Sequence, residues 1–168
     1  MDDRPTRDPI REAHRQWVAH GWADAADAMA LVTSVTRAQQ LLAERVERAL
    51  KPHGLTFARF EVLRLLSFTR ERALPMTRLG SLLQVHPTSV TSAVDRLEKQ
   101  GFVRRVRGDG DRRVVLAEIT GAGREVVERA TEGLNTDVFG APGIGAESTA
   151  ELTRLLGELR ASAGDRVD

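Results

Sequence analysis

Residues 76–120 constrain the fold of this chain more than any other segment, because their apolar spacing and turn residues follow a fixed order. A short helix comes first, and Pro87 then begins a second one, since proline suits the first helical position. Gly101 ends the second helix, and two strands follow at 102–107 and 114–119. The order predicts a helix-turn-helix with a β-hairpin wing, an arrangement that fits against duplex DNA.

The second of these helices has one apolar stripe and one polar face. The stripe contains Val90, Ala93, Val94 and Leu97. Small side chains let the backbone approach a DNA groove, and hydroxyls and arginine reach phosphates and base edges. We therefore expect DNA contacts from six residues, namely Pro87, Thr88, Ser89, Thr91, Ser92 and Arg96.

Charge is distributed unevenly, although the net charge of the chain is only +1. Residues 96–113 hold seven Lys or Arg against three Asp or Glu, whereas residues 114–168 hold five Arg against ten acids. A basic middle with an acidic C-terminal region predicts one surface that faces phosphates while the rest repels them.

Composition excludes several classes of protein. The chain has no cysteine, so disulfides, thiolate metal sites and thiol oxidation sensing are excluded. No apolar run reaches the roughly 18 residues of a membrane span, and no signal peptide is visible, so we expect a soluble, cytoplasmic protein. The chain also has no phosphate-binding glycine loop, nucleophile elbow, His-Glu-x-x-His motif or tyrosine. We expect no enzyme and no cofactor.

Long helices flank the central segment. From about residue 11 to Lys51 the pattern is helical, with a break at Gly21. A heptad seam follows that break, formed by Ala28, Val32, Val35, Gln39, Leu42, Val46 and Ala49. The seam either packs inside one subunit or joins two subunits.

Further helix starts follow from capping residues. Thr56, Thr77 and Thr120 each precede an apolar helical pattern, and Ser148 stands three residues before Glu151, as in a capping box. The glycine-containing segment 139–146 interrupts the helical pattern before the last helix. That helix is expected to bury Leu152, Leu155, Leu156 and Leu159.

The residues LGSLLQVHPTSVTSAVDRLEKQGFVRR, and then DRRVVLAEIT followed by GAG, resemble the MarR family of bacterial transcription regulators. Family wings carry an Asp-x-Arg before an apolar strand and a closing Leu-Thr-x-x-Gly. Here these motifs are Asp111-x-Arg113 and Thr120-x-x-Gly123, with Ile119 in place of Leu. The resemblance covers about residues 24–160 and implies a homodimer that places two recognition helices in successive major grooves of a near-palindromic operator.

The resemblance also implies roles in the wing. Arg113 would enter the minor groove, Asp111 would position it, and Arg112 would add a second DNA contact. The alternative is an Arg–Asp pair that only stiffens the hairpin. Many members have a further Asp and Arg where this chain has Gly108 and Gly110, so this wing should be more flexible and carry one cation fewer.

The expected fold is mainly α with a small β-hairpin wing, a winged helix-turn-helix joined to a helical dimerisation region. Residues 1–22 form an N-terminal arm, 23–55 and 121–165 the dimerisation region, and 56–120 the DNA-binding domain.

Family members commonly respond to a small aromatic or organic acid. The arm with Trp17 and Trp22 resembles the extra helix of the urate-responsive branch, and Glu61 could be the acidic member of such a pocket. The alternative is that both indoles are apolar anchors of a dimer interface. We expect a ligand-responsive regulator that acts as a repressor rather than as an activator.

Two other functions remain open. The chain's histidines, His14, His20, His53 and His86, show no zincin spacing and assign no metal site, but a zinc-responsive regulator of the same fold could assemble one between subunits. The third hypothesis is a winged-helix protein-interaction module that does not bind DNA.

Overall fold

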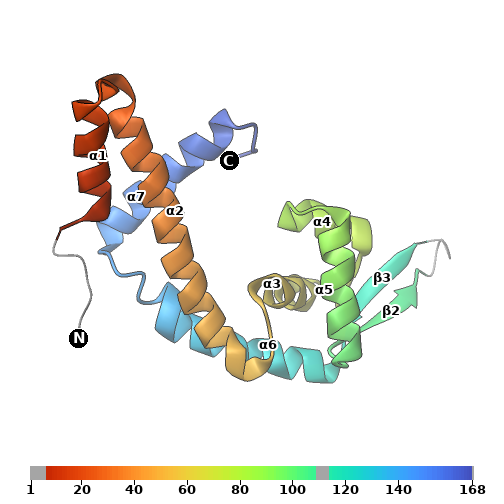
Figure 1. The fold of residues 1–168 in the computed structure, drawn as a ribbon. Coiled ribbons are helices and arrows are strands. Elements are labelled where there is room, and N and C mark those ends of the chain that lie inside the picture. Colours follow the sequence, from red (N-terminus) through yellow and green to blue (C-terminus); the bar gives the residue numbers. More distant parts are fainter. Residues whose placement is uncertain (1–6, 109–113, 168) are drawn as a thin grey trace. The chain divides into compact units, whose positions relative to one another are not determined.

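The structure, a computed structural model, describes residues 7–108 and 114–167 (Figure 1). The chain divides into two compact units, of which the first ends at Arg45 and the second begins at Val46. Among the described residues, no helix is both long enough and apolar enough to cross a membrane.

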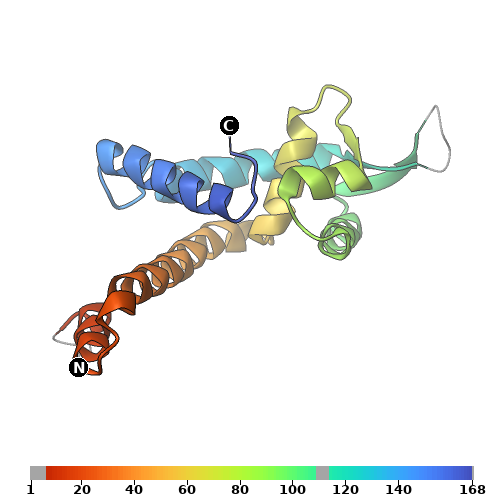
Figure 2. The ribbon, with the colours of Figure 1, turned by 90° about the horizontal axis from the view of Figure 1, so that it is seen from above.

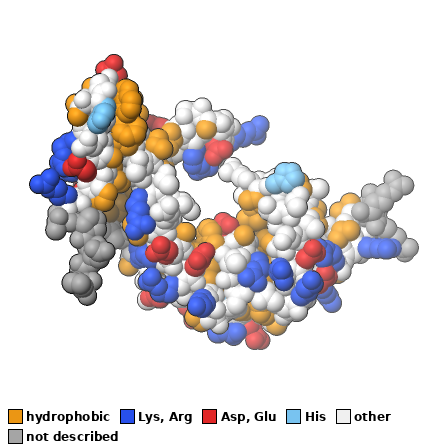
Figure 3. All heavy atoms as spheres, viewed as in Figure 1, with side chains coloured by type: hydrophobic (Ala, Val, Ile, Leu, Met, Phe, Trp, Pro, Cys, Tyr) orange, Lys and Arg blue, Asp and Glu red, His pale blue; other side chains and the backbone are white. Residues whose placement is uncertain are grey.

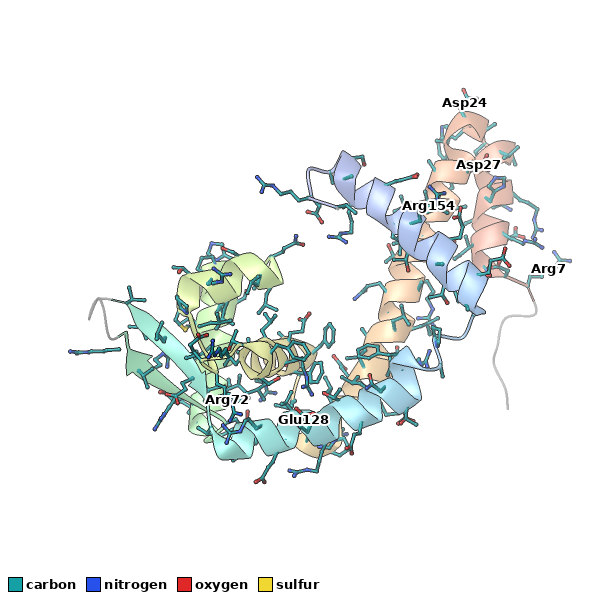
Figure 4. All side chains as sticks on the ribbon, turned by 180° about the vertical axis from the view of Figure 1, so that it is seen from behind. Arg7, Asp24, Asp27, Arg72, Glu128 and Arg154 are labelled. Carbon is teal, nitrogen blue, oxygen red and sulfur yellow. The ribbon has the colours of Figure 1, made fainter. Side chains whose placement is uncertain are left out.

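The first unit is a helical hairpin of α1 (Pro9–Ala19) and most of α2 (Ala23–Leu50). The predicted break at Gly21 is confirmed, because its φ of +86° is a left-handed conformation that cannot continue a helix. His14 Nε2 lies 2.8 Å from Asp27 Oδ1 and joins the two helices; Figure 4 labels Asp27 beside α1.

The second unit is a set of helices around a three-stranded antiparallel sheet. Its elements, in chain order, are η1 (Lys51–His53), α3 (Phe57–Phe68), β1 (Ala73–Pro75), α4 (Met76–Leu83), α5 (Pro87–Lys99), β2 (Val103–Arg107), β3 (Val115–Ile119), α6 (Gly121–Leu134), η2 (Asn135–Phe139) and α7 (Ala146–Ser162). The mainly α fold class and the hairpin wing are confirmed.

The sheet contains a third strand, β1, that the sequence analysis did not predict. Its order is β1-β3-β2, with Leu74 and Arg105 both opposite Ala117. Strand β1 is short and contains Pro75, so it has no sequence signal of its own. It forms because the outer edge of β3 has unpaired backbone groups that a neighbouring extended segment satisfies.

Two predicted helix caps are wrong. Helix α4 begins at Met76 directly after the extended Pro75, which places Thr77 inside the first turn. Helix α7 begins at Ala146 after the extended Gly145, so Ser148 lies within the helix. Thr56 is at the predicted cap position without making the capping bond. Only the cap at Thr120 is confirmed, where Oγ1 accepts a hydrogen bond from the N–H of Gly123 at 3.0 Å.

The apolar core of the second unit lies where α3, α4, α5, α6 and β3 meet. Its fully buried members are Leu50, Val62, Leu63, Leu66, Leu79, Val94, Leu97, Ala117, Val127, Ala130 and Leu134. The predicted buried stripe of α5 is confirmed at Val90, Val94 and Leu97. The stripe determines which face of α5 is left for solvent.

The predicted burial is wrong for three of the four α7 leucines in this single chain, whereas Leu156 is half-buried. Leu152, Leu155 and Leu159 are 47%, 46% and 50% exposed. Several seam residues of α2 are also open, including Val32 at 65%. These apolar faces are exposed to solvent in the described protomer. The domain boundaries predicted from the sequence stay a prediction.

Candidate nucleic-acid interface

Helix α5 exposes all six residues predicted to contact DNA, because its other side is buried in the core. The imidazole of His86 caps the helix, since its Nδ1 accepts a hydrogen bond from the N–H of Thr88 at 3.3 Å. Thr91 Oγ1 donates to the carbonyl of Pro87. Among the described residues, the hydroxyls of Ser89 and Ser92 have no hydrogen-bond partner and are available to a ligand.

A groove of about 610 Å³ runs between α5 and the start of α3. It is lined by hydroxyls and arginines, namely Thr56, Arg59, Thr88, Ser89, Ser92 and Arg96, and also by Ala58 and Ala93. Hydroxyl and guanidinium donors suit phosphate oxygens. Thr56 and Arg59, which also line this groove, were not among the residues predicted from the sequence. Their signal in the sequence was only their position at the start of the helix that precedes the helix-turn-helix.

Part of the predicted basic charge is neutralised inside the fold. Arg104 of β2 makes two hydrogen bonds to Glu118 of β3, at 3.0 and 2.9 Å. Arg105 pairs with Asp95 and Glu98 of α5, both at 2.5 Å. Among the described residues of 96–108, the cations without an ion pair are therefore Arg96, Lys99 and Arg107. Figure 3 shows blue and red side chains side by side around the lower part of α5.

Arg105 joins the wing to α5 through Asp95 and Glu98. Partial burial would lower the pKa of Arg105, but its hydrogen bonds to Asp95 and Glu98 outweigh that effect and raise the pKa. The guanidinium therefore stays charged and joins β2 to α5. It also neutralises Asp95, a carboxylate that would otherwise repel phosphates from this face.

The hairpin of β2 and β3 projects away from the helices of its unit (Figures 1 and 2). Its tip is where the predicted wing residues Asp111, Arg112 and Arg113 belong, and these lie outside the described residues. Their roles stay a prediction.

The predicted effector residues fall into two groups. Trp17 and Trp22 lie together in the first unit, with ring centroids 5.4 Å apart, and His20 stacks on Trp22. Glu61 belongs to the second unit, where it enters an apolar pocket of about 280 Å³. The other lining residues are Phe57, Phe60, Arg64, Leu65, Leu82, Leu83 and Phe139.

Glu61 and Arg64 share this pocket wall without pairing. Burial raises the pKa of Glu61, because its charged form loses hydration. The Arg64 guanidinium points instead to α6, where it binds Glu128 at 2.9 Å and also Thr131; Figure 4 labels Glu128 on that helix. Arg64 Nε is buried and has no hydrogen-bond partner among the described residues. The pocket therefore holds one carboxyl with a raised pKa among apolar side chains.

Glu61→Gln is expected to raise thermal stability near neutral pH. The folded chain binds a proton at Glu61 more readily than the unfolded chain, so this group's contribution to stability falls as pH rises above the ordinary pKa of 4.5. The neutral amide avoids that loss. The gain in Tm over wild type should be larger at about pH 7 than at about pH 4, measured by circular dichroism. An equal gain at both would contradict the assignment of a buried, ionising carboxyl.

The described residues contain no group of three or more His, Asp or Glu side chains placed to hold a metal ion. His14 is used in the α1–α2 contact and His86 in the cap of α5. The zinc hypothesis therefore gains no support from this protomer.

Comparisons with known proteins agree with the fold. The MarR family model matches residues 55–115. A MarR family transcriptional regulator of Streptomyces coelicolor, solved at near atomic resolution, is 46% identical, with a TM-score of 0.75 over 84% of this chain and 99% of that chain. A second regulator of that organism, solved in complex with DNA, is 26% identical, with a TM-score of 0.70 over 80% of this chain and 90% of that chain.

Curated relatives give the same result. The HTH-type transcriptional regulator YkoM of Bacillus subtilis is 34% identical over 102 residues, which are 61% of this chain and 65% of that protein. The chain spans slightly less than two thirds of the length of the first curated relatives that it matches. These relatives are named as regulators, which supports the prediction that the chain is not an enzyme.

Proposed function

The chain belongs to the MarR family of transcriptional regulators, and from this premise we propose that it binds duplex DNA as a homodimer through α5 and the wing. The observation that carries the proposal is the groove beside α5, where free hydroxyls lie between Arg59 and Arg96. Recognition helices place small polar side chains and arginines in the major groove in the same way. A 26% identical regulator was solved in complex with DNA, which supports DNA binding by this chain.

The open apolar faces support the homodimer. The leucines of α7 and the seam of α2 would each leave a row of apolar side chains in water if the protomer stayed alone. A second copy offers the same two faces and can cover both by two-fold symmetry. In such a dimer two α5 helices could read half-sites about 34 Å apart.

The proposed regulation is repression that a small aromatic or organic acid relieves. The Glu61 pocket supports this class of effector, because its walls are aromatic and aliphatic and its polar groups are few. Glu61 is the pocket residue that could hydrogen-bond to such a ligand, because the Arg64 guanidinium already binds Glu128 and Thr131. Titrating urate as the probe should change intrinsic Trp fluorescence and DNA affinity; no change in either would exclude urate-like effectors.

A mobility-shift titration tests DNA binding directly. The full chain would be titrated against DNA flanking its own gene, at about 50 and about 200 mM salt. A specific shift that weakens steeply with salt is expected. If a folded, dimeric protein shifts no fragment, the protein-interaction module becomes the better hypothesis.

Arg113→Ala is expected to weaken binding to the shifted fragment by about 1–3 kcal/mol, because an arginine in the narrow minor groove meets concentrated negative potential. The slope of log affinity against log salt should fall by about 0.9 for each arginine lost. An unchanged slope would show that the wing does not touch DNA.

A further inference from the structure

We propose that Gln100 is a positioning residue, which holds the Arg59 guanidinium at the edge of the α5 groove so that it can bind a backbone phosphate. This inference rests on the proposed DNA binding. It adds Arg59 and Gln100 to the proposed interface, and neither residue is among the six α5 residues predicted to contact DNA. Both lie at places where the chain leaves or enters a helix.

The contacts form a short chain of hydrogen bonds. Arg59 Nη1 donates to Gln100 Oε1 at 2.9 Å, and Arg59 Nε donates to Thr56 Oγ1 at 3.2 Å. The amide of Gln100 then donates to the carbonyl of Gly54 at 3.0 Å. Both oxygen and nitrogen of the Gln100 amide are therefore used, and its orientation is determined by its partners.

The partners of Arg59 orient it without neutralising it. Arg104 and Arg105 pair with carboxylates, whereas Arg59 pairs with an amide and a hydroxyl. Its Nη2 has no hydrogen-bond partner among the described residues, and its side chain lines the same groove as Arg96. A full positive charge and one free donor edge thus remain for an anion.

Holding Arg59 in advance matters because its side chain is long and flexible. A guanidinium that is already fixed loses less rotamer freedom when it binds phosphate. Gln100 also connects this arginine to the recognition helix, since its own N–H donates to the carbonyl of Arg96 at 3.1 Å. The phosphate contact and α5 would therefore dock in one fixed geometry.

A double-mutant cycle on DNA affinity tests the proposal. Arg59→Ala and Gln100→Ala are each expected to weaken binding by about tenfold, on both the shifted fragment and a duplex of unrelated sequence, because phosphate contacts carry little sequence information. The double variant should bind no more weakly than Arg59→Ala alone, since Gln100 acts only through Arg59. Gln40→Ala is the matched control, because Gln40 accepts from Arg37 at 3.2 Å on α2, and it should leave affinity unchanged.

Further measurements distinguish a failure of the Gln100 proposal from a failure of the proposed DNA binding. Gln100→Glu keeps an acceptor for Arg59 but adds a negative charge, so it should weaken binding more than Gln100→Ala does. Losses that add in the double variant, or a Gln100→Ala protein with wild-type affinity, would overturn the proposal. If the wild-type chain itself binds neither duplex, the proposed function fails instead. Thermal unfolding of each variant checks that it is folded at the assay temperature.

Discussion

Ser92→Glu is expected to weaken binding to the operator fragment at least about 100-fold, because like charges brought together in an interface cost several kcal/mol. Ser92 is exposed in the centre of the α5 face, where it lines the groove together with Arg96. A carboxylate there would face phosphates and base edges, and a homodimer would carry the substitution twice. The measurement is a mobility-shift titration of wild type and variant at one salt concentration.

The same substitution should leave the fold intact. The Ser92 hydroxyl has no hydrogen-bond partner among the described residues, so folding loses no contact when it is replaced. Gln40→Glu on the exposed surface of α2 is the charge-matched control and should bind like wild type. Wild-type affinity of Ser92→Glu would mean that α5 does not face DNA.

Gly123→Ala is expected to destabilise the protein by about 3 kcal/mol or more, because the added methyl group has no space. A Cβ at Gly123 would lie 2.1 Å from the carbonyl oxygen of Phe102 and 2.8 Å from Ile119 Cγ1. Phe102 cannot move away easily, since its carbonyl accepts from Thr120 at 3.0 Å and its N–H donates to Leu97 at 2.9 Å. The start of α6 would be forced away from the wing.

Gly133→Ala, in the same helix, is the control. A Cβ at Gly133 would meet nothing within 4 Å, so alanine should stabilise α6 by about 0.5–1 kcal/mol through its higher helix propensity. Urea unfolding followed by circular dichroism measures both variants. A Gly123→Ala midpoint equal to that of wild type would contradict the close packing of α6 against the Phe102 carbonyl.

The role of Ser92 can be predicted from the sequence, whereas the constraint on Gly123 depends on the tertiary structure. The polar face around Ser92 is visible in the sequence, because helical periodicity assigns each residue of α5 to one side of the helix. The constraint on Gly123 is not, since a glycine in a Thr-x-x-Gly motif does not show which carbonyl lies against it. Only the pairing of β2 with β3 brings Phe102 to that position.

Among the charged residues, too, some agree with the prediction from the sequence and others depend on the tertiary structure. Counting charges along residues 96–113 predicted a basic surface, and Arg96 and Lys99 agree with it. Arg104 and Arg105 do not, because their acidic partners come from β3 and α5. Arg59, which lines the groove, is 41 positions from Gln100, and no spacing rule connects residues so far apart.

The sequence by itself determined the order of the longer helices and the two wing strands, the helix boundaries at Gly21, Pro87 and Gly101, and the polar face of α5. Periodicity and turn residues act over a few neighbouring positions, so they can be recognised without a structure. The tertiary structure decided the edge strand β1, the groove that joins α3 to α5, and which arginines keep an unpaired charge. These features depend on how separate elements dock, and docking is determined by the packing of the whole core.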